Sequence, residues 1–161
     1  MNEQRETISI GEWKVLSRSG TLRTCGLGSC VCVVLYDDTY VHAGMVHIML
    51  PDSNQARKTA FNPWRYADTA LTLLHRELVN QGASNLQAKI AGGAQMFRHA
   101  MRQEYMQIGK RNVEAVTLWL EDAHIPVVAK DVGGACGRTV EFTLPTFTMH
   151  VRTASKTIKQ I

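Results

Sequence analysis

The chain has 161 residues, of which 45% are hydrophobic and 20% are charged, and its formal net charge is +4 at pH 7. This length and composition predict a single globular domain over residues 1–161 and exclude a disordered chain. The excess of positive charge is small and the Lys and Arg residues are scattered, so the sequence predicts no nucleic-acid partner.

We expect no targeting or membrane-spanning segment from the sequence. Its start, "MNEQRETISIGEW", is polar and lacks the apolar stretch of a secretory signal. There is no run of about 18 apolar residues, so we expect no direct membrane insertion. These features predict a cytoplasmic protein, and in that reducing compartment the four cysteines are not expected to form a disulfide framework.

Three strands are expected in the first part of the chain. Residues 8–16 predict the first strand, which "SRSG" breaks. Residues 30–36 and 41–49 predict two antiparallel strands on either side of the turn "DDTY". Both of these strands are apolar on both faces, which indicates that each face of their sheet is covered.

Two amphipathic helices follow. The first is expected to begin at Pro63, with Asn62 as its N-cap, and to stop at Gly82. The second is expected over residues 111–125, with apolar residues at helical spacing.

The remaining segments predict more strands. A strand leading into a Gly-Gly turn occurs twice, at residues 86–93 and 127–134. Residues 138–144 and 147–153 predict a hairpin, and the tail after them is expected to fray, as is the N-terminal tail. Helices that alternate with antiparallel strands favour an α+β fold.

Cys30 is the first candidate for chemistry. It follows "GLGS" and opens an apolar strand. Glycines allow a tight turn, and the backbone N–H groups of Gly26, Gly28, Ser29 and Cys30 could converge there on a developing oxyanion. The alternative is a packed thiol, because free cysteine is among the most buried residue types.

Two other interpretations of this segment are weaker. A phosphate-binding loop requires a helix directly after the glycines, whereas a strand follows here. A zinc site would have to use Cys25, Cys30, Cys32 and Cys136, with His47 as an optional further ligand, and the chain has no C-x-x-C pair. We therefore expect no metal.

A nucleophilic cysteine needs a base, because a free thiol has a pKa of about 8.5. His47 lies near the end of the strand that follows the Cys30 strand, so pairing of the two strands would bring the side chains close. Thr24, just before the glycine turn, could orient the imidazole through its hydroxyl. The alternatives are a hydrogen-bonded core histidine and an ordinary turn threonine.

Six blocks of sequence, in this order, resemble CheD, the family of chemoreceptor glutamine deamidases of bacterial chemotaxis. The blocks are "TCGLGSCVCVVLYD", "HAGMVHIMLP", "RYADTAL", "KIAGGAQMF", "IGKRNVEAV" and "DVGGACGR". The resemblance implies a four-layer α/β/β/α sandwich of mostly antiparallel or mixed sheets, like that of cysteine hydrolases. It also implies a catalytic site of Cys30, His47 and Thr24.

The resemblance further implies a reaction and partners. Cys30 would form a thioester with glutamines on the cytoplasmic helices of chemoreceptors, releasing ammonia and leaving glutamate without a cofactor. Glutamyl methyl esters could be hydrolysed by the same route. The Gly-Gly turns at Gly92, Gly93, Gly133 and Gly134 are candidate substrate contacts, with plain turns as the alternative. A CheC-type phosphatase is a candidate partner, and the competing hypothesis is a binding module that regulates such a phosphatase with little catalysis.

Overall fold

The computed structural model describes residues 3–56, 61–95, 107–155 and 157–161. These residues form two five-stranded sheets and two α-helices. Sheet A has the order β1-β3-β8-β9-β10, with bounds Arg5–Ile8, Gly20–Leu27, Arg138–Leu144, Thr148–Thr153 and Ile158–Gln160. Sheet B has the order β2-β5-β4-β6-β7, with bounds Trp13–Ser17, His42–Ile48, Val31–Asp37, Gln87–Gly92 and Val127–Val132. The helices are α1, Ala67–Asn80, and α2, Ile108–Asp122.

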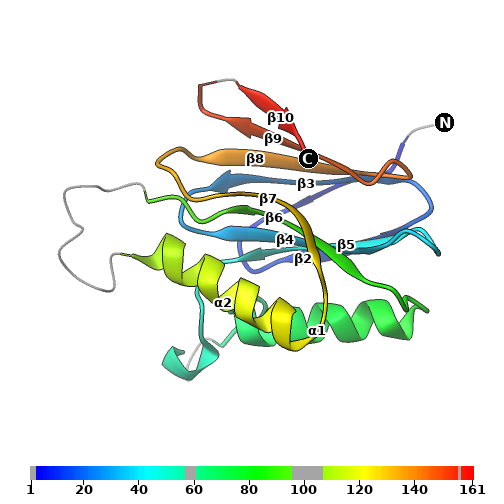
Figure 1. The fold of residues 1–161 in the computed structure, drawn as a ribbon, viewed down its shortest axis with the longest axis horizontal. Coiled ribbons are helices and arrows are strands. Elements are labelled where there is room, and N and C mark those ends of the chain that lie inside the picture. Colours follow the sequence, from blue (N-terminus) through cyan, green and yellow to red (C-terminus); the bar gives the residue numbers. More distant parts are fainter. Residues whose placement is uncertain (1–2, 57–60, 96–106, 156) are drawn as a thin grey trace.

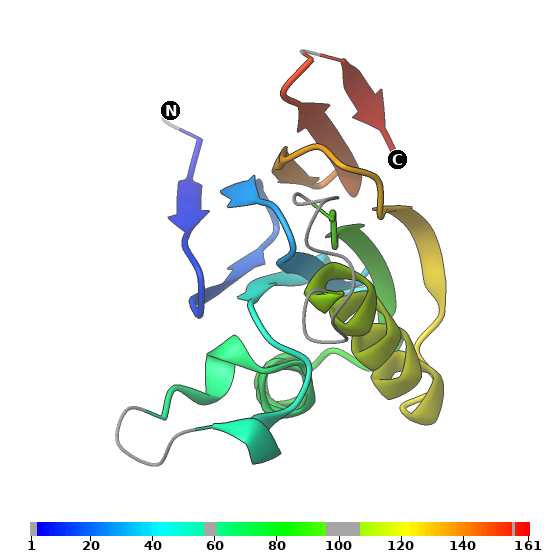
Figure 2. The same ribbon diagram turned by 90° about the vertical axis from the view of Figure 1, so that its left-hand side faces the viewer.

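Both helices lie on the side of sheet B that faces away from sheet A, as Figures 1 and 2 show. One hydrophobic core fills the space between the two sheets, and a second fills the space between sheet B and the helices. The α+β class and the mixed sheets are as expected, since β1–β3 and β6–β7 are parallel pairs and the other neighbouring strands are antiparallel.

The expectation of four layers is wrong for the residues that the structure describes, which form three: helices, sheet B and sheet A. The reason lies in the outer face of sheet A. Along β8, buried residues alternate with half-buried polar ones such as Thr139 and Glu141. The antiparallel part of sheet A, β3-β8-β9-β10, can with this alternation face water on one side and needs no helix over it.

The β4–β5 hairpin forms the centre of the molecule. All seven residues of β4 are buried, because one face of the strand packs toward sheet A and the other toward the helices. The strands pair in antiparallel register from Val31 with Ile48 to Asp37 with His42. The predicted pairing and the predicted cover on both faces are confirmed.

The N-terminal strands differ from the expectation. Residues 8–16 are not one strand, because the chain turns between β1 and β2 at Gly11, whose φ is +72°. The Glu12 N–H donates to the Ser9 carbonyl at 3.0 Å in this turn. β1 therefore joins sheet A and β2 joins sheet B.

Some other boundaries also differ from the expectation. Asn62 does act as an N-cap, accepting from the Trp64 N–H, but it caps a short 3-10 turn, Pro63–Arg65, and α1 begins only at Ala67. The helix α2 begins at Ile108, three residues before the predicted start. The C-terminal tail forms β10 against β9 rather than fraying.

The two strand–Gly-Gly segments are neighbours. Strands β6 and β7 pair in parallel, so both Gly-Gly turns lie at the same edge of sheet B. The Gly133 N–H donates to the Gly92 carbonyl at 2.9 Å, which joins the two turns directly.

Asp37 is the last residue of β4, and its carboxylate binds backbone groups of two other segments. Its carboxylate accepts from the backbone N–H groups of Thr39 and Ser84 at 2.8 Å each, and also from those of Tyr40 and Asn85. Burial, the largest single effect, would raise the pKa of Asp37, but the four donors together hold it below its usual value. The side chain thus ties the β4–β5 turn to the segment that follows α1.

Replacing Asp37 with Asn is expected to destabilise the protein by about 2 kcal/mol, because an amide cannot accept from both pairs of donors. Urea unfolding measures this cost. The exposed neighbour provides the control, since Asp38→Asn should change stability by less than about 0.5 kcal/mol. Equal stability of the Asp37→Asn and Asp38→Asn variants would contradict this role of Asp37.

Because the pKa of Asp37 is depressed in the folded state, its contribution to stability is present above about pH 4 and is lost as the pH falls further.

Candidate active site

Cys30 and His47 lie on the face of sheet B that points toward sheet A. His47 pairs directly with Cys32 of β4, and Cys30 immediately precedes β4. Both cysteines belong to the core between the sheets. Since alternate residues share a face, Cys30, one residue beyond the ladder, lies on the face of Cys32, diagonally across from His47.

Thr24 reaches the same space from the opposite sheet. Its Oγ1 lies 2.8 Å from Nδ1 of His47 and 2.7 Å from the carbonyl oxygen of Ile8. Thr24 and Ile8 are partners in the parallel β3–β1 pair. A continuous row of hydrogen bonds therefore runs from β1 through β3 to β5.

This row determines the tautomer of His47. A carbonyl oxygen can only accept, so the single hydroxyl proton of Thr24 goes to Ile8. The hydroxyl oxygen must then accept from an Nδ1–H of His47. The proton of the neutral imidazole is thereby held on Nδ1, and the lone pair is on Nε2.

His47 is suited to act as a base. It is fully buried, and burial lowers its pKa to about 4, so the imidazole is neutral at neutral pH. Within the described part of the chain its Nε2 has no hydrogen-bond partner. The lone pair of Nε2 is therefore free to take a proton.

Cys30 is the more accessible of the two inward-facing thiols. It is 7% exposed, whereas Cys32 is 0% exposed. Burial raises the pKa of the Cys30 thiol, an effect that the backbone N–H of Cys30 itself partly offsets. Burial also raises the pKa of Cys32. At neutral pH the resting site therefore contains a thiol and a neutral imidazole.

The turn before Cys30 is held by backbone hydrogen bonds. Gly26 has φ +70°, a left-handed conformation that permits the bulge at the end of β3. The Gly28 N–H donates to the Gly26 carbonyl at 3.1 Å, and the Gly28 carbonyl accepts from Ala94 at 2.8 Å. Among the described residues, the Ser29 N–H has no acceptor, and the Cys30 N–H has no backbone acceptor and bonds only to its own thiol. Of these three donors, those of Ser29 and Cys30 can turn to a ligand, whereas the Gly28 donor is occupied.

The Gly-Gly turn after β6 is hydrogen-bonded to the backbone of Cys30. The Gly93 N–H donates to the Cys30 carbonyl at 2.8 Å. A Cβ on Gly92 would lie 2.3 Å from the same carbonyl oxygen, so a side chain is excluded there. The N–H groups of Gly93 and Gly133 are both used in these internal contacts.

The same glycines border an open space. Gly93, Gly133 and Gly134 line a cleft of about 400 Å³ together with Lys110 and Val113 of α2 and their neighbours. Cys30 and His47 are not among its lining residues. The cleft therefore lies between the Gly-Gly turns and α2, and the Cys30 thiol does not line it.

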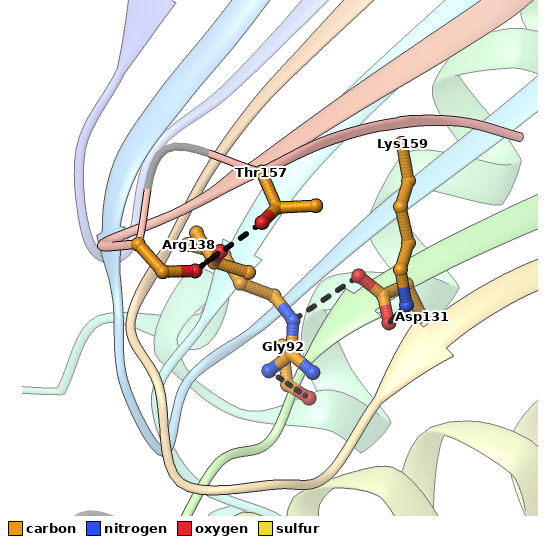
Figure 3. Close-up of polar contacts among 7 residues, drawn as sticks. Gly92, Asp131, Arg138, Thr157 and Lys159 are labelled. Carbon is orange, nitrogen blue, oxygen red and sulfur yellow. Dashed lines mark hydrogen bonds and ion pairs between the residues drawn. The ribbon is translucent and has the colours of Figure 1, made fainter.

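Arg138 holds the Gly-Gly turn in place, as Figure 3 shows. Its guanidinium donates to the Gly92 carbonyl and to the Asp131 carboxylate, each at 3.4 Å. The side chain is only 7% exposed. Lys159 of β10 approaches the other oxygen of Asp131 at 3.8 Å. These contacts connect β7, β8 and β10 to Gly92, which lies in the Gly-Gly turn that binds the Cys30 carbonyl.

Arg138 and Asn112 also contact the backbone around the site, although neither was predicted as a site residue from the sequence. The Asn112 side chain donates to the carbonyls of Ser29 and Met49, each at 2.9 Å. A signal for Asn112 was present, since this polar residue occupies the apolar stripe of its helix, four residues before Val116.

Two features are absent from the described residues, namely a metal-binding cluster and a membrane-spanning helix. In residues 3–56, 61–95, 107–155 and 157–161, no three His, Cys, Asp or Glu side chains are grouped so that they could bind a metal ion. Neither of the helices in these ranges has the length and hydropathy needed to cross a bilayer.

Comparisons with known proteins agree on one family. The family model described as "CheD chemotactic sensory transduction" matches residues 49–153. A protein of Halalkalibacterium halodurans is 50% identical over 156 residues, covering 96% of each chain. One of Bacillus velezensis is 42% identical, covering 92% of this chain and 91% of its own, and one of Bacillus subtilis is 40% identical, covering 96% and 94%. All three are named "Chemoreceptor glutamine deamidase CheD".

Ring-nitrogen NMR spectra of isotope-labelled histidine should show His47 as a neutral imidazole with the proton on Nδ1 at about pH 6, where a free imidazole is largely protonated. Thr24→Val, which keeps the shape but removes the acceptor, should abolish this tautomer preference. An imidazolium signal from His47 at about pH 6 would contradict the assignment.

Because burial lowers the pKa of His47 in the folded protein to about 4, its contribution to stability is complete above about pH 6.5 and is lost as the pH falls toward 4.

Proposed function

The chain belongs to the CheD family, and we propose that it hydrolyses the side-chain amide of chemoreceptor glutamines, leaving glutamate and releasing ammonia. Full-length similarity to three relatives named as chemoreceptor glutamine deamidases supports this activity. The proposed substrate lies on the cytoplasmic helices of the receptors, and the enzyme would act there in the cytoplasm.

One observation carries the assignment of residues. The hydrogen bonds from His47 to Thr24 and from Thr24 to Ile8 leave the lone pair on Nε2, on the face of sheet B that also carries Cys30. A thiol that starts protonated needs such a base before it can attack a carboxamide.

The reaction proceeds through a thioester. Sγ of Cys30 attacks the carboxamide carbon while its proton passes to Nε2 of His47. The tetrahedral oxyanion accepts from the N–H groups of Cys30 and Ser29. The imidazolium then gives its proton to the amide nitrogen, and ammonia leaves. Water, deprotonated by His47, hydrolyses the thioester, which yields glutamate and restores the thiol.

The residues around the pair have supporting roles in this cycle. Thr24 keeps Nδ1 protonated and holds the ring in place, so that Nε2 can alternate between base and acid. Nucleophile, base and oxyanion donors are all groups of the chain, so the cycle requires no metal or organic cofactor. A glutamyl methyl ester would follow the same path, with methanol as the leaving group.

A receptor cytoplasmic fragment incubated with the protein should gain the mass of glutamine-to-glutamate conversion, and Cys30→Ala should abolish this change. Mass spectrometry of the digested fragment identifies the modified glutamines. Cys25→Ala and Cys136→Ala are the matched controls, because both thiols are exposed and free, and both variants should retain activity.

The alternative function gives a different result in the same experiment. A binding module that regulates a CheC-type phosphatase would leave receptor glutamines unchanged. Its effect on such a phosphatase would also survive Cys30→Ala. Deamidation by the intact chain, lost with the thiol, therefore separates the two functions.

The pH profile of kcat/KM tests the neutral pair. The value should stay level from about pH 8 to about pH 5, because the free enzyme loses its base only when His47 is protonated, and burial lowers the pKa of His47 to about 4. Circular dichroism at each pH verifies that the protein stays folded. A half-maximal loss at about pH 6.5 would instead indicate an ordinary, solvated imidazole.

A further inference from the structure

Asn112 is a polar side chain in an apolar position. It is 0% exposed and lies on α2 in line with Val116 and Leu120, which pack in the core between the helices and sheet B. An amide in such a place must find hydrogen-bond partners, since burying it without them is unfavourable. Its partners therefore show why an amide occupies this position.

Both partners are backbone carbonyls at the ends of the two site strands. Nδ2 donates to the Ser29 carbonyl and to the Met49 carbonyl, each at 2.9 Å. Ser29 immediately precedes Cys30, and Met49 follows His47 by two residues. One nitrogen thus contacts the segment of the nucleophile and the segment of the base.

The β4–β5 ladder ends where Asn112 binds. Its last pair is Val31 with Ile48. Cys30 would face Met49 in the next pair, but the Met49 N–H donates instead to the Arg65 carbonyl at 2.9 Å. The strands separate at this point, and no ladder hydrogen bond sets the distance between the Cys30 and Met49 segments. The Asn112 amide spans this opening.

Only a side chain with two donors on one atom can do this. A carbonyl accepts and cannot donate, so the NH₂ group must face the two carbonyls and Oδ1 must face away. Among the described residues Oδ1 has no partner. Ionised aspartate offers no donor, and serine offers one.

We propose that Asn112 is a positioning residue, which sets the separation of Cys30 and His47 by clamping the Ser29 and Met49 carbonyls to one nitrogen. This inference rests on the proposed deamidase function. Asn112 does not touch the substrate, and it acts through the two segments that carry the thiol and the imidazole. Catalysis depends steeply on such separations, since a misplacement of about 1 Å can cost about 100-fold in rate.

The test compares Asn112→Asp and Asn112→Ser with Val116→Ala. Val116 is also 0% exposed and lies one turn along the same helix, so its truncation weakens the same packing without touching either carbonyl. Asn112→Asp should lower kcat about 100-fold with KM little changed, and Asn112→Ser should lower it less. Val116→Ala should lower Tm while kcat stays near that of the parent.

Two results would overturn the proposal. The first is a folded Asn112→Asp variant whose kcat is within about threefold of the parent. The second is a loss of kcat in Val116→Ala as large as that in the Asn112 variants, which would assign the effect to packing alone. If Asn112→Asp does not fold, the Asn112→Ser variant is judged by the same two criteria.

A second readout separates this inference from the proposed function. Iodoacetamide alkylation of Cys30, measured by mass spectrometry against exposed Cys25 as the internal reference, needs no receptor. Release of the two carbonyls should speed alkylation of Cys30 several-fold in the Asn112 variants and leave Cys25 unchanged. A parent chain that deamidates no receptor would refute the proposed function, whereas an unchanged Cys30 alkylation rate would refute the role of Asn112.

Discussion

The arrangement of the site depends on one buried hydrogen bond, from Nδ1 of His47 in sheet B to the hydroxyl of Thr24 in sheet A. An imidazole in an apolar interior must be paired, and its partner comes from the opposite sheet. The partner has a proton of its own to place, which goes to the Ile8 carbonyl. Three groups, the Ile8 carbonyl, the Thr24 hydroxyl and the His47 imidazole, therefore set the relative positions of β1, β3 and β5. Apolar packing supplies most of the stability, and this polar row specifies which residues meet.

Burial also explains why Cys30 and His47 are both uncharged at neutral pH. A low-dielectric interior disfavours charge, so it disfavours both an imidazolium and a thiolate. In the proposed reaction the site is neutral at rest and becomes charged only in the intermediate, where the proposed oxyanion donors and the transferred proton compensate. Backbone hydrogen bonds join the glycine turn to the Gly-Gly turn, since the Gly93 N–H donates to the Cys30 carbonyl and the Ala94 N–H donates to the Gly28 carbonyl.

The sequence was informative where local pattern decides structure. The apolar runs at residues 30–36 and 41–49 correctly predicted the antiparallel β4–β5 pair, in which His47 lies opposite Cys32. β3 was not predicted, because its residues, "GTLRTCGL", are mostly small or polar, and the strand exists only through pairing with β1 and with the distant β8. The expected fourth layer came from a family resemblance, whereas the alternating polarity of β8 is the local pattern that decides the outer face of sheet A. The roles of Asn112 and Arg138 were missed for a different reason: Asn112 contacts the Ser29 and Met49 carbonyls and Arg138 contacts the Gly92 carbonyl, all remote in sequence, and no residue pattern encodes where a carbonyl will point.

The alternation of side chains in β4 and β5 also restricts how the length of this chain can change in evolution. Cys32 and His47 are paired across the hairpin, and both face sheet A. A single-residue insertion or deletion inside β5 ahead of His47 would reverse the face of every later residue in the strand and turn the imidazole toward the helices. The connection at residues 38–41 lies outside the ladder, so added residues there leave the parity of both strands unchanged. Descendants of this sequence can therefore gain or lose residues in the hairpin turn, whereas the two strands must keep their length.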